Sequence, residues 1–251
     1  MNDKAKQPFL SHLEELRNRL IISFIAIGIA AAGSYVFAEE IFHFLTAPLM
    51  AGLPETGKMI FTSPTEMIFT YIKIALITGL MISSPIVFLQ IWKFIAPGLY
   101  QNEKKYVIPF VALSTILFVG GVLFGYLMVL PLGFKVLMSL APDNVEAAIK
   151  VNEYFSISTK MLLGIGIGFE MPIVIFFLTK MGIVNIAFLK KNRKYAILLA
   201  FIASAILTPP DPVTQCIMAG PMIILSEAGI FFAGFAEKKK KEKEEKESDE
   251  D

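Results

Sequence analysis

Hydrophobic residues in this chain are gathered into long uncharged runs that are separated by short charged segments. Three of these runs contain no charged residue at all: residues 20–38, 74–92 and 106–134. A helix needs about 20 mostly apolar residues to cross the roughly 30 Å hydrocarbon core of a bilayer. Runs of this length therefore predict membrane-spanning helices.

The second half of the chain has three further apolar runs, each with a peculiarity. Residues 161–179 contain one charge, Glu170, and residues 212–236 also contain one, Glu227. The run at 195–208 is too short, since a helix of its length reaches only about 21 Å at 1.5 Å per residue. The prolines of LTPPDP, which lie between the last two runs, cannot continue a helix and predict a tight hairpin turn.

These runs predict an all-α, polytopic membrane protein with one six-span domain over residues 1–236. The expected spans are 20–38, 67–92, 106–134, 155–179, 195–208 and 212–236. The connecting segments 39–64 and 135–153 are apolar enough to pack, and we expect short helices there that lie along the membrane interface. Residues 237–251 form a charge block without aromatic residues, which predicts a disordered tail.

Composition and charge distribution support this picture and orient it. Hydrophobic residues make up 55% of the chain and charged residues only 18%. On the six-span topology, 18 lysines and arginines fall on the side that holds both termini and 5 on the other. The excess of positive charge on cytoplasmic loops then places both termini in the cytoplasm. The single cysteine, Cys216, excludes an intrachain disulfide.

The segment FLSHLEELRNRL, which precedes the first run, carries paired charges at the edge of the predicted membrane. Ser11 and Glu14 have the spacing of a capping box, which predicts that a helix begins there. Glu15 and Arg19 stand four residues apart, so a surface ion pair worth about 0.3–0.5 kcal/mol explains them without any function.

A second acid, Glu103, falls on the same predicted face as Glu15. It lies next to a candidate N-cap, Asn102, and a carboxylate in a first helical turn is favoured by the helix dipole. That structural explanation stays open. Both acids nevertheless project from the cytoplasmic side of the predicted topology.

Glu170 is the acid that a structural role explains least well. An ionisable side chain at the middle of a bilayer costs at least about 2.5–3.5 kcal/mol, so it needs a wet groove, a polar partner or a proton. Gly164 and Gly168 precede it with a spacing that suits close approach of another helix.

The sequence offers no constellation for catalysis or for a metal. His12 and His43 fall on opposite sides of the predicted membrane, and no metalloprotease, nucleophile-elbow or phosphate-loop pattern occurs. We therefore expect no enzyme activity, no cofactor and no metal, and no nucleic-acid partner.

Four short motifs together resemble the TatC family, the integral receptors of the twin-arginine protein translocase. They are HLEELR before the first span, IWKFIAPGLYQNEKK between the second and third, GFEMP in the fourth and LTPPDP before the sixth. They occur in the family's order across residues 9–235.

The resemblance implies a cupped bundle of six helices with short fifth and sixth helices, in a bacterial cytoplasmic membrane. It further implies recognition of twin-arginine signal peptides and export of folded proteins, driven by the proton-motive force, together with single-span TatA- and TatB-type partners and a homo-oligomeric receptor complex. The residues that match the family's signal-peptide site are Glu15, Arg17, Phe94 and Glu103. Glu170 matches the acid linked to partner helices, and Pro48, Asp211 and Gln215 match other sensitive positions.

Two other functions remain open on the sequence. A proton-coupled small-solute transporter could use Glu170 as its carrier, but the chain shows no internal repeat of the kind common in transporter folds. A structural scaffold for other membrane proteins is the third interpretation.

Overall fold

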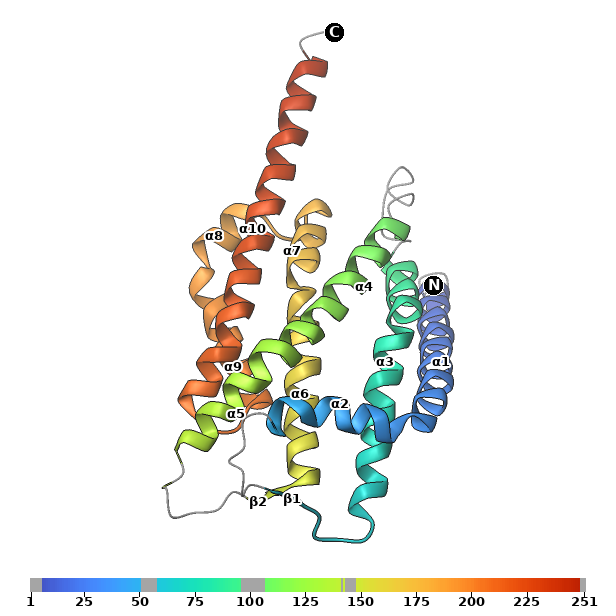
Figure 1. The fold of residues 1–251 in the computed structure, drawn as a ribbon. Coiled ribbons are helices and arrows are strands. Elements are labelled where there is room, and N and C mark those ends of the chain that lie inside the picture. The colour runs from blue at the N-terminus through green and yellow to red at the C-terminus, as the bar shows by residue number, and fades with distance from the viewer. Residues whose placement is uncertain (1–5, 51–57, 96–106, 141, 143–147, 249–251) are drawn as a thin grey trace. The chain divides into compact units, whose positions relative to one another are not determined.

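The computed structural model describes residues 6–50, 58–95, 107–140, 142 and 148–248. Helices dominate these residues (Figure 1). Their bounds are α1 Lys6–Val36, α2 Ala38–Met50, α3 Glu66–Ile95, α4 Val107–Phe124, the π-helical turn η3 Gly125–Val129, α5 Leu130–Ser139, α6 Val151–Phe169, α7 Met171–Lys180, α8 Ile186–Lys191, α9 Arg193–Leu207 and α10 Pro212–Ser248. The strands β1 Lys58–Ile60 and β2 Ala148–Lys150 pair in a small sheet.

Five helical stretches among the described residues are long and apolar enough to cross a membrane. They are His12–Val36, Glu66–Ile95, Val107–Ser139, Val151–Lys180 and Pro212–Phe235. The sixth predicted span is α9, whose 15 residues reach about 22 Å. The resemblance implied that the fifth and sixth helices are both short. Only the fifth, α9, is short, since the apolar part of α10 has 24 residues.

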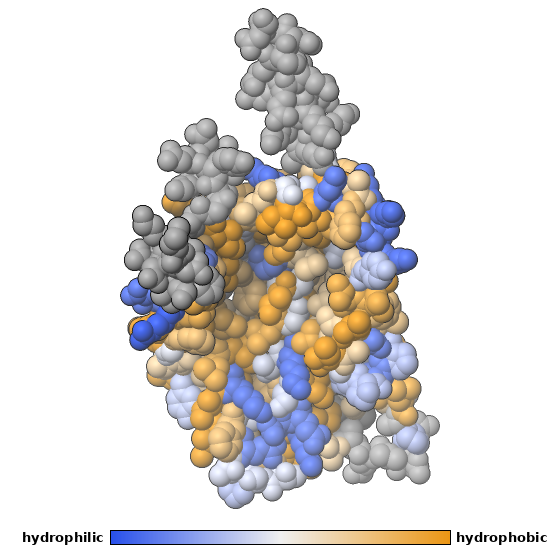
Figure 2. Space-filling model, turned by 180° about the vertical axis from the view of Figure 1, so that it is seen from behind, coloured by the Kyte–Doolittle hydropathy of each residue, from blue (hydrophilic) through white to orange (hydrophobic). Residues whose placement is uncertain are grey.

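Large apolar side chains are exposed along these stretches, as a bilayer-facing surface requires. Phe24, Ile29 and Val36 of α1 are 69%, 70% and 75% exposed. Apolar residues, drawn in orange, cover much of the face seen in Figure 2. Exposing so many large apolar side chains is favourable in the hydrocarbon of a bilayer and unfavourable in water.

Two helix ends differ from the sequence-based expectation. The first helix begins at Lys6, so Ser11 lies inside it and the predicted capping box at Ser11 is wrong. At the other end, α10 continues to Ser248 instead of giving way to a disordered tail after residue 236. The tail is rich in Lys and Glu, which are strong helix formers, and Pro8 stands in the first turn of α1, where proline is tolerated. In the tail, Lys and Glu also recur four residues apart, a spacing that supports a helix.

Prolines interrupt two of the long stretches. Pro131 stands in the first turn of α5, directly after the π-helical turn η3. Pro172 stands in the first turn of α7, and Glu170 is the residue between α6 and α7. Proline has no backbone N–H to donate to the preceding turn, so the helix changes its hydrogen bonding there.

The segments between spans follow the prediction in one case only. The expected short helix after the first span is α2, which runs across the direction of α1 and α3 (Figure 1). The segment after α5 instead contains β2, whose central residue is the more buried one of the strand. A strand of three residues leaves too little periodicity in the sequence to be predicted.

The described helices belong to two compact units. Unit 1 comprises Met1–Ala47, Met59–Val119 and Ile149–Phe155, and unit 2 comprises Pro48–Lys58, Gly120–Ala148 and Ser156–Asp251. In unit 1 the backbones of α1 and α3 come very close at Gly79. A Cβ added there would lie 2.6 Å from the Ala31 nitrogen, so only glycine fits this crossing.

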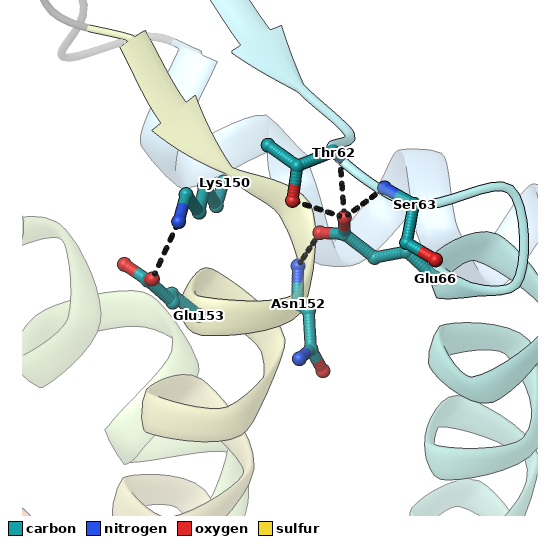
Figure 3. A network of polar contacts seen from close by, with 6 residues as sticks. All are labelled: Thr62, Ser63, Glu66, Lys150, Asn152 and Glu153. Atoms are coloured by element: carbon teal, nitrogen blue, oxygen red, sulfur yellow. Dashed lines mark hydrogen bonds and ion pairs between the residues drawn. The ribbon is translucent and has the colours of Figure 1, made fainter.

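Unit 1 is also held together by a buried carboxylate, Glu66, at the start of α3 (Figure 3). Its Oε2 accepts hydrogen bonds from the backbone N–H groups of Thr62 at 2.7 Å and Ser63 at 3.4 Å. Its Oε1 accepts the backbone N–H of Asn152, 86 residues away, at 2.8 Å. Glu66 is only 7% exposed, so one side chain joins the turn before α3 to the start of α6.

Replacing Glu66 by Gln should destabilise the protein by about 1–3 kcal/mol, because the amide cannot accept all these donors and leaves a partly buried N–H unpaired. Thermal or denaturant unfolding of the full chain in detergent measures the change. Glu153→Gln is the matched control, since the neighbouring Lys150–Glu153 pair is 3.6 Å apart and exposed. Its loss should cost at most about 1 kcal/mol. Equal stability of the two variants would contradict the role of Glu66.

Candidate functional site

The carboxylate of Glu15 is the centre of a cluster of polar and aromatic groups in unit 1. Its Oε1 accepts a hydrogen bond from Arg19 Nε at 3.1 Å and a second, closer one from Arg19 Nη2. The predicted pair of Glu15 and Arg19 is therefore confirmed. The other oxygen, Oε2, lies 3.8 Å from His12 Nδ1.

The aromatic part of this cluster comes from the end of α3. The ring of Phe94 stacks on His12, with centroids 4.4 Å apart and planes 15° from parallel. Two residues earlier, buried Trp92 donates to Ser114 Oγ at 3.2 Å and stacks on Phe110. The end of α3 is thus fixed on α4, and α3 in turn presents Phe94 to the first turns of α1.

An open depression lies beside Glu15. It is lined by Glu14, Glu15, Asn18, Arg19, Ile22 and Gln90. Five of these six side chains are polar, and two are carboxylates. A depression of this composition suits a cationic ligand with several hydrogen-bond donors.

The other residues predicted for this site are placed less completely. Arg17 is exposed on α1, two residues from Glu15. Glu103 lies outside the described residues, so its distance from Glu15 stays a prediction. Sequence reasoning missed His12 as a member of the site. Its spacing of three residues from Glu15 puts it on the same side of a helix, and that signal was present in the sequence.

Glu170 lies in unit 2, within the stretch Val151–Lys180, as predicted. It occupies the junction of α6 and α7, and its backbone carbonyl accepts the N–H of Val174 at 3.0 Å. The residue as a whole is partly exposed, while its Oε1 atom is buried. The acid thus sits where the helix is interrupted, inside an apolar stretch.

The small-residue face before Glu170 packs within the chain. A Cβ added at Gly164 would collide with Leu207, and one at Gly168 would lie 3.1 Å from Met222 Cε. Leu207 ends α9 and Met222 belongs to α10. The close approach predicted from the glycine spacing is therefore made by the protein's own helices, and these two glycines are not left open for another protein.

Asp211 and Gln215 hold the hairpin between α9 and α10. Asp211 precedes Pro212, the first residue of α10, and its Oδ1 accepts the Thr214 backbone N–H at 2.7 Å. This is N-capping, with proline at the favoured first position. Gln215 Nε2 donates to the Phe201 carbonyl of α9 at 3.0 Å. The third of these predicted positions, Pro48, lies inside α2 and is partly buried.

If Asp211 acts as a cap, Asp211→Ala should lower the free energy of unfolding by about 0.5–2 kcal/mol, and Asp211→Asn should lower it far less, because Asn caps equally well. Unfolding of both variants in detergent, measured by circular dichroism, separates them. A large loss in the Asn variant would show that the negative charge matters and not the cap.

The described residues hold no group of three or more His, Cys, Asp or Glu side chains that could bind a metal ion. The only cysteine of the sequence, Cys216, is exposed. The candidate sites offer carboxylates, which can bind a cation or accept hydrogen bonds from a donor.

Comparison with known proteins identifies the family. The family described as Sec-independent protein translocase protein (TatC) matches residues 11–221. A protein of that name from Desulforapulum autotrophicum is 47% identical over 238 residues, which is 95% of this chain and 88% of the relative. The Escherichia coli K12 protein of that name is 37% identical over 94% of this chain and 91% of its own length.

A solved structure agrees with these relatives. The crystal structure of a twin-arginine translocase receptor, TatC, matches with a TM-score of 0.81 and 42% identity. The match covers 90% of this chain and 99% of the other. These similarities favour the translocase over the small-solute transporter, and they indicate a non-enzymatic, multi-pass membrane component of protein transport. The chain belongs to the TatC family of Sec-independent protein translocase proteins.

Proposed function

We propose that this chain is the receptor for twin-arginine signal peptides in a translocase that exports folded proteins across the bacterial cytoplasmic membrane. Export is driven by the proton-motive force, and both termini face the cytoplasm. Membership of the TatC family supports this function, as does the likeness to a crystal structure that is itself named a twin-arginine translocase receptor.

The observation that carries the proposal is the geometry around Glu15. Its carboxylate already binds a guanidinium, that of Arg19, through two N–H groups. It also borders an open depression with a second acid, Glu14. A site that accepts one guanidinium within the chain has the chemistry to accept one from a signal peptide.

Two arginines require two acceptors, and we assign the second to Glu103. Arginine donates through a planar fork that fits a carboxylate, whereas lysine offers a single point of charge, so paired carboxylates select arginine. Phe94 contributes an aromatic face beside the acid, and Arg17 contributes charge on the exposed side of α1. Each charge-assisted hydrogen bond is worth about 1.5–3 kcal/mol.

The partners follow from the intramembrane acid and the exposed apolar helices. Glu170 provides a polar contact for the single-span TatA- and TatB-type helices, because an ionisable group inside an apolar stretch is stabilised by a polar partner. The receptor works as a homo-oligomer in the lipid bilayer. Asp211 and Gln215 contribute by holding the α9–α10 hairpin, and Pro48 by its place in α2.

Charge reversal at Glu15 tests the receptor function. Glu15→Lys should abolish, and Glu15→Gln should weaken by about tenfold or more, the binding of a fluorescent twin-arginine signal peptide, since a charge-assisted bond of this kind is lost. Binding is measured by anisotropy with the full chain in lipid nanodiscs. Glu40→Lys is the control, because it makes the same charge change at an exposed position of α2. Unchanged affinity for the peptide in both Glu15 variants would contradict the proposed receptor function.

Glu170 is tested by co-purification of the single-span partners. Glu170→Leu should reduce the recovered partners several-fold and stop transport, because it removes the polar group. Glu170→Gln should retain most of the partners, since the amide still forms hydrogen bonds in the membrane. Full recovery of partners and full transport with the Leu variant would contradict this role.

A further inference from the structure

Glu15 is not an open carboxylate in the structure. Arg19 donates to its Oε1 through both Nε and Nη2, and His12 Nδ1 stands 3.8 Å from its Oε2. The side chains of Glu15 and Arg19 are 33% and 21% exposed, so the pair is partly withdrawn from water. A positively charged group of the chain itself therefore occupies the acid that the proposed function assigns to a signal-peptide arginine.

The helix fixes this arrangement. Glu15 precedes Arg19 by four residues, the order and spacing that place the two side chains together on one face. Arg19 also lines the same depression as Glu15. An incoming guanidinium thus approaches the acid from a space that Arg19 shares.

We propose that Arg19 competes, as part of the same chain, for the carboxylate of Glu15. Arg19 must release this carboxylate before an arginine of the signal peptide can bind it. This inference rests on the proposed receptor function. Binding is then an exchange of one guanidinium for another. The carboxylate has a positive partner before and after the exchange, and Arg19 pairs with it again when the peptide leaves.

The exchange lowers the apparent affinity of the site for every ligand that binds Glu15. When a competent state is only partly populated, the apparent dissociation constant rises by the inverse of that population. This factor is the same for every ligand that needs Glu15. A twin-arginine ligand, which binds strongly, still binds after this loss of affinity. A weaker ligand, such as a twin-lysine sequence, then binds too weakly to be recognised.

The test compares two peptides on variants of the full chain in lipid nanodiscs. One peptide carries twin arginine, and the other is identical except for twin lysine. Arg19→Gln should strengthen the binding of both peptides by the same factor, about 1.4- to fivefold, which is the range expected for a partly exposed ion pair. Arg19→Lys should tighten both by a smaller factor, because lysine still pairs with Glu15 but only through one point of contact.

Two comparisons separate competition from general charge repulsion. Arg19→Lys keeps the charge, so tightening in this variant cannot come from reduced repulsion of a cationic peptide. Lys93→Gln removes an exposed positive charge next to Phe94 in the last turn of α3 and should change affinity by much less than Arg19→Gln. A thermal melt of each variant verifies that it is folded.

The outcomes are distinct from those of the proposed function. If Glu15→Gln weakens binding but both Arg19 variants bind as the parent does or more weakly, Arg19 is no competitor and the receptor function stands. Arg19 is likewise no competitor if Lys93→Gln tightens binding as much as Arg19→Gln. If Glu15→Gln leaves peptide binding unchanged, the receptor assignment of Glu15 fails and this inference fails with it.

Discussion

The high free-energy cost of an unpaired carboxylate near hydrocarbon is the constraint on which the chemistry of this protein depends. Three acids meet it with partners of three kinds. Glu15 takes a guanidinium, Glu66 takes backbone N–H groups from two segments, and Asp211 caps the helix that follows it. Glu227 of α10 pairs with Arg193 at 2.9 Å. Each of these four acids therefore has its partner within the chain.

The spans and the chemistry of Glu15 could be predicted from the sequence because both depend on local patterns. Apolar runs predict the helices, and a four-residue spacing predicts the Glu15–Arg19 pair. Helix starts are harder, as the motif Ser-x-x-Glu illustrates. At Ser11 it lies inside a helix, because α1 begins five residues earlier, at Lys6. At Ser63, three residues before α3 begins, Glu66 accepts the Ser63 N–H, but the Ser63 hydroxyl contacts Thr65 Oγ1, so only half of a capping box forms.

What the sequence could not supply is the identity of partners that are distant along the chain. The bond from Asn152 to Glu66 spans 86 residues, and no periodicity encodes it. The glycine spacing before Glu170 correctly predicted close packing. It did not predict which residues pack there, because Leu207 and Met222 belong to other helices, α9 and α10. The stack of Phe94 on His12 belongs to the same class. Its two residues come from separate helices.

The close crossing of α1 and α3 lies far along α1 from the acid of the candidate site. Ala31 faces Gly79 with no room for a further carbon atom, so a larger residue at Gly79 would push the two helices apart there. Glu15 lies 16 positions away on the same helix, an arm of about 24 Å at 1.5 Å per residue. Rotating α1 by about 5° at the crossing would therefore swing the carboxylate by about 2 Å, most of a hydrogen-bond length. Gly79, the smallest residue in α3, thus stands where a small change in the angle between the helices is magnified at Glu15.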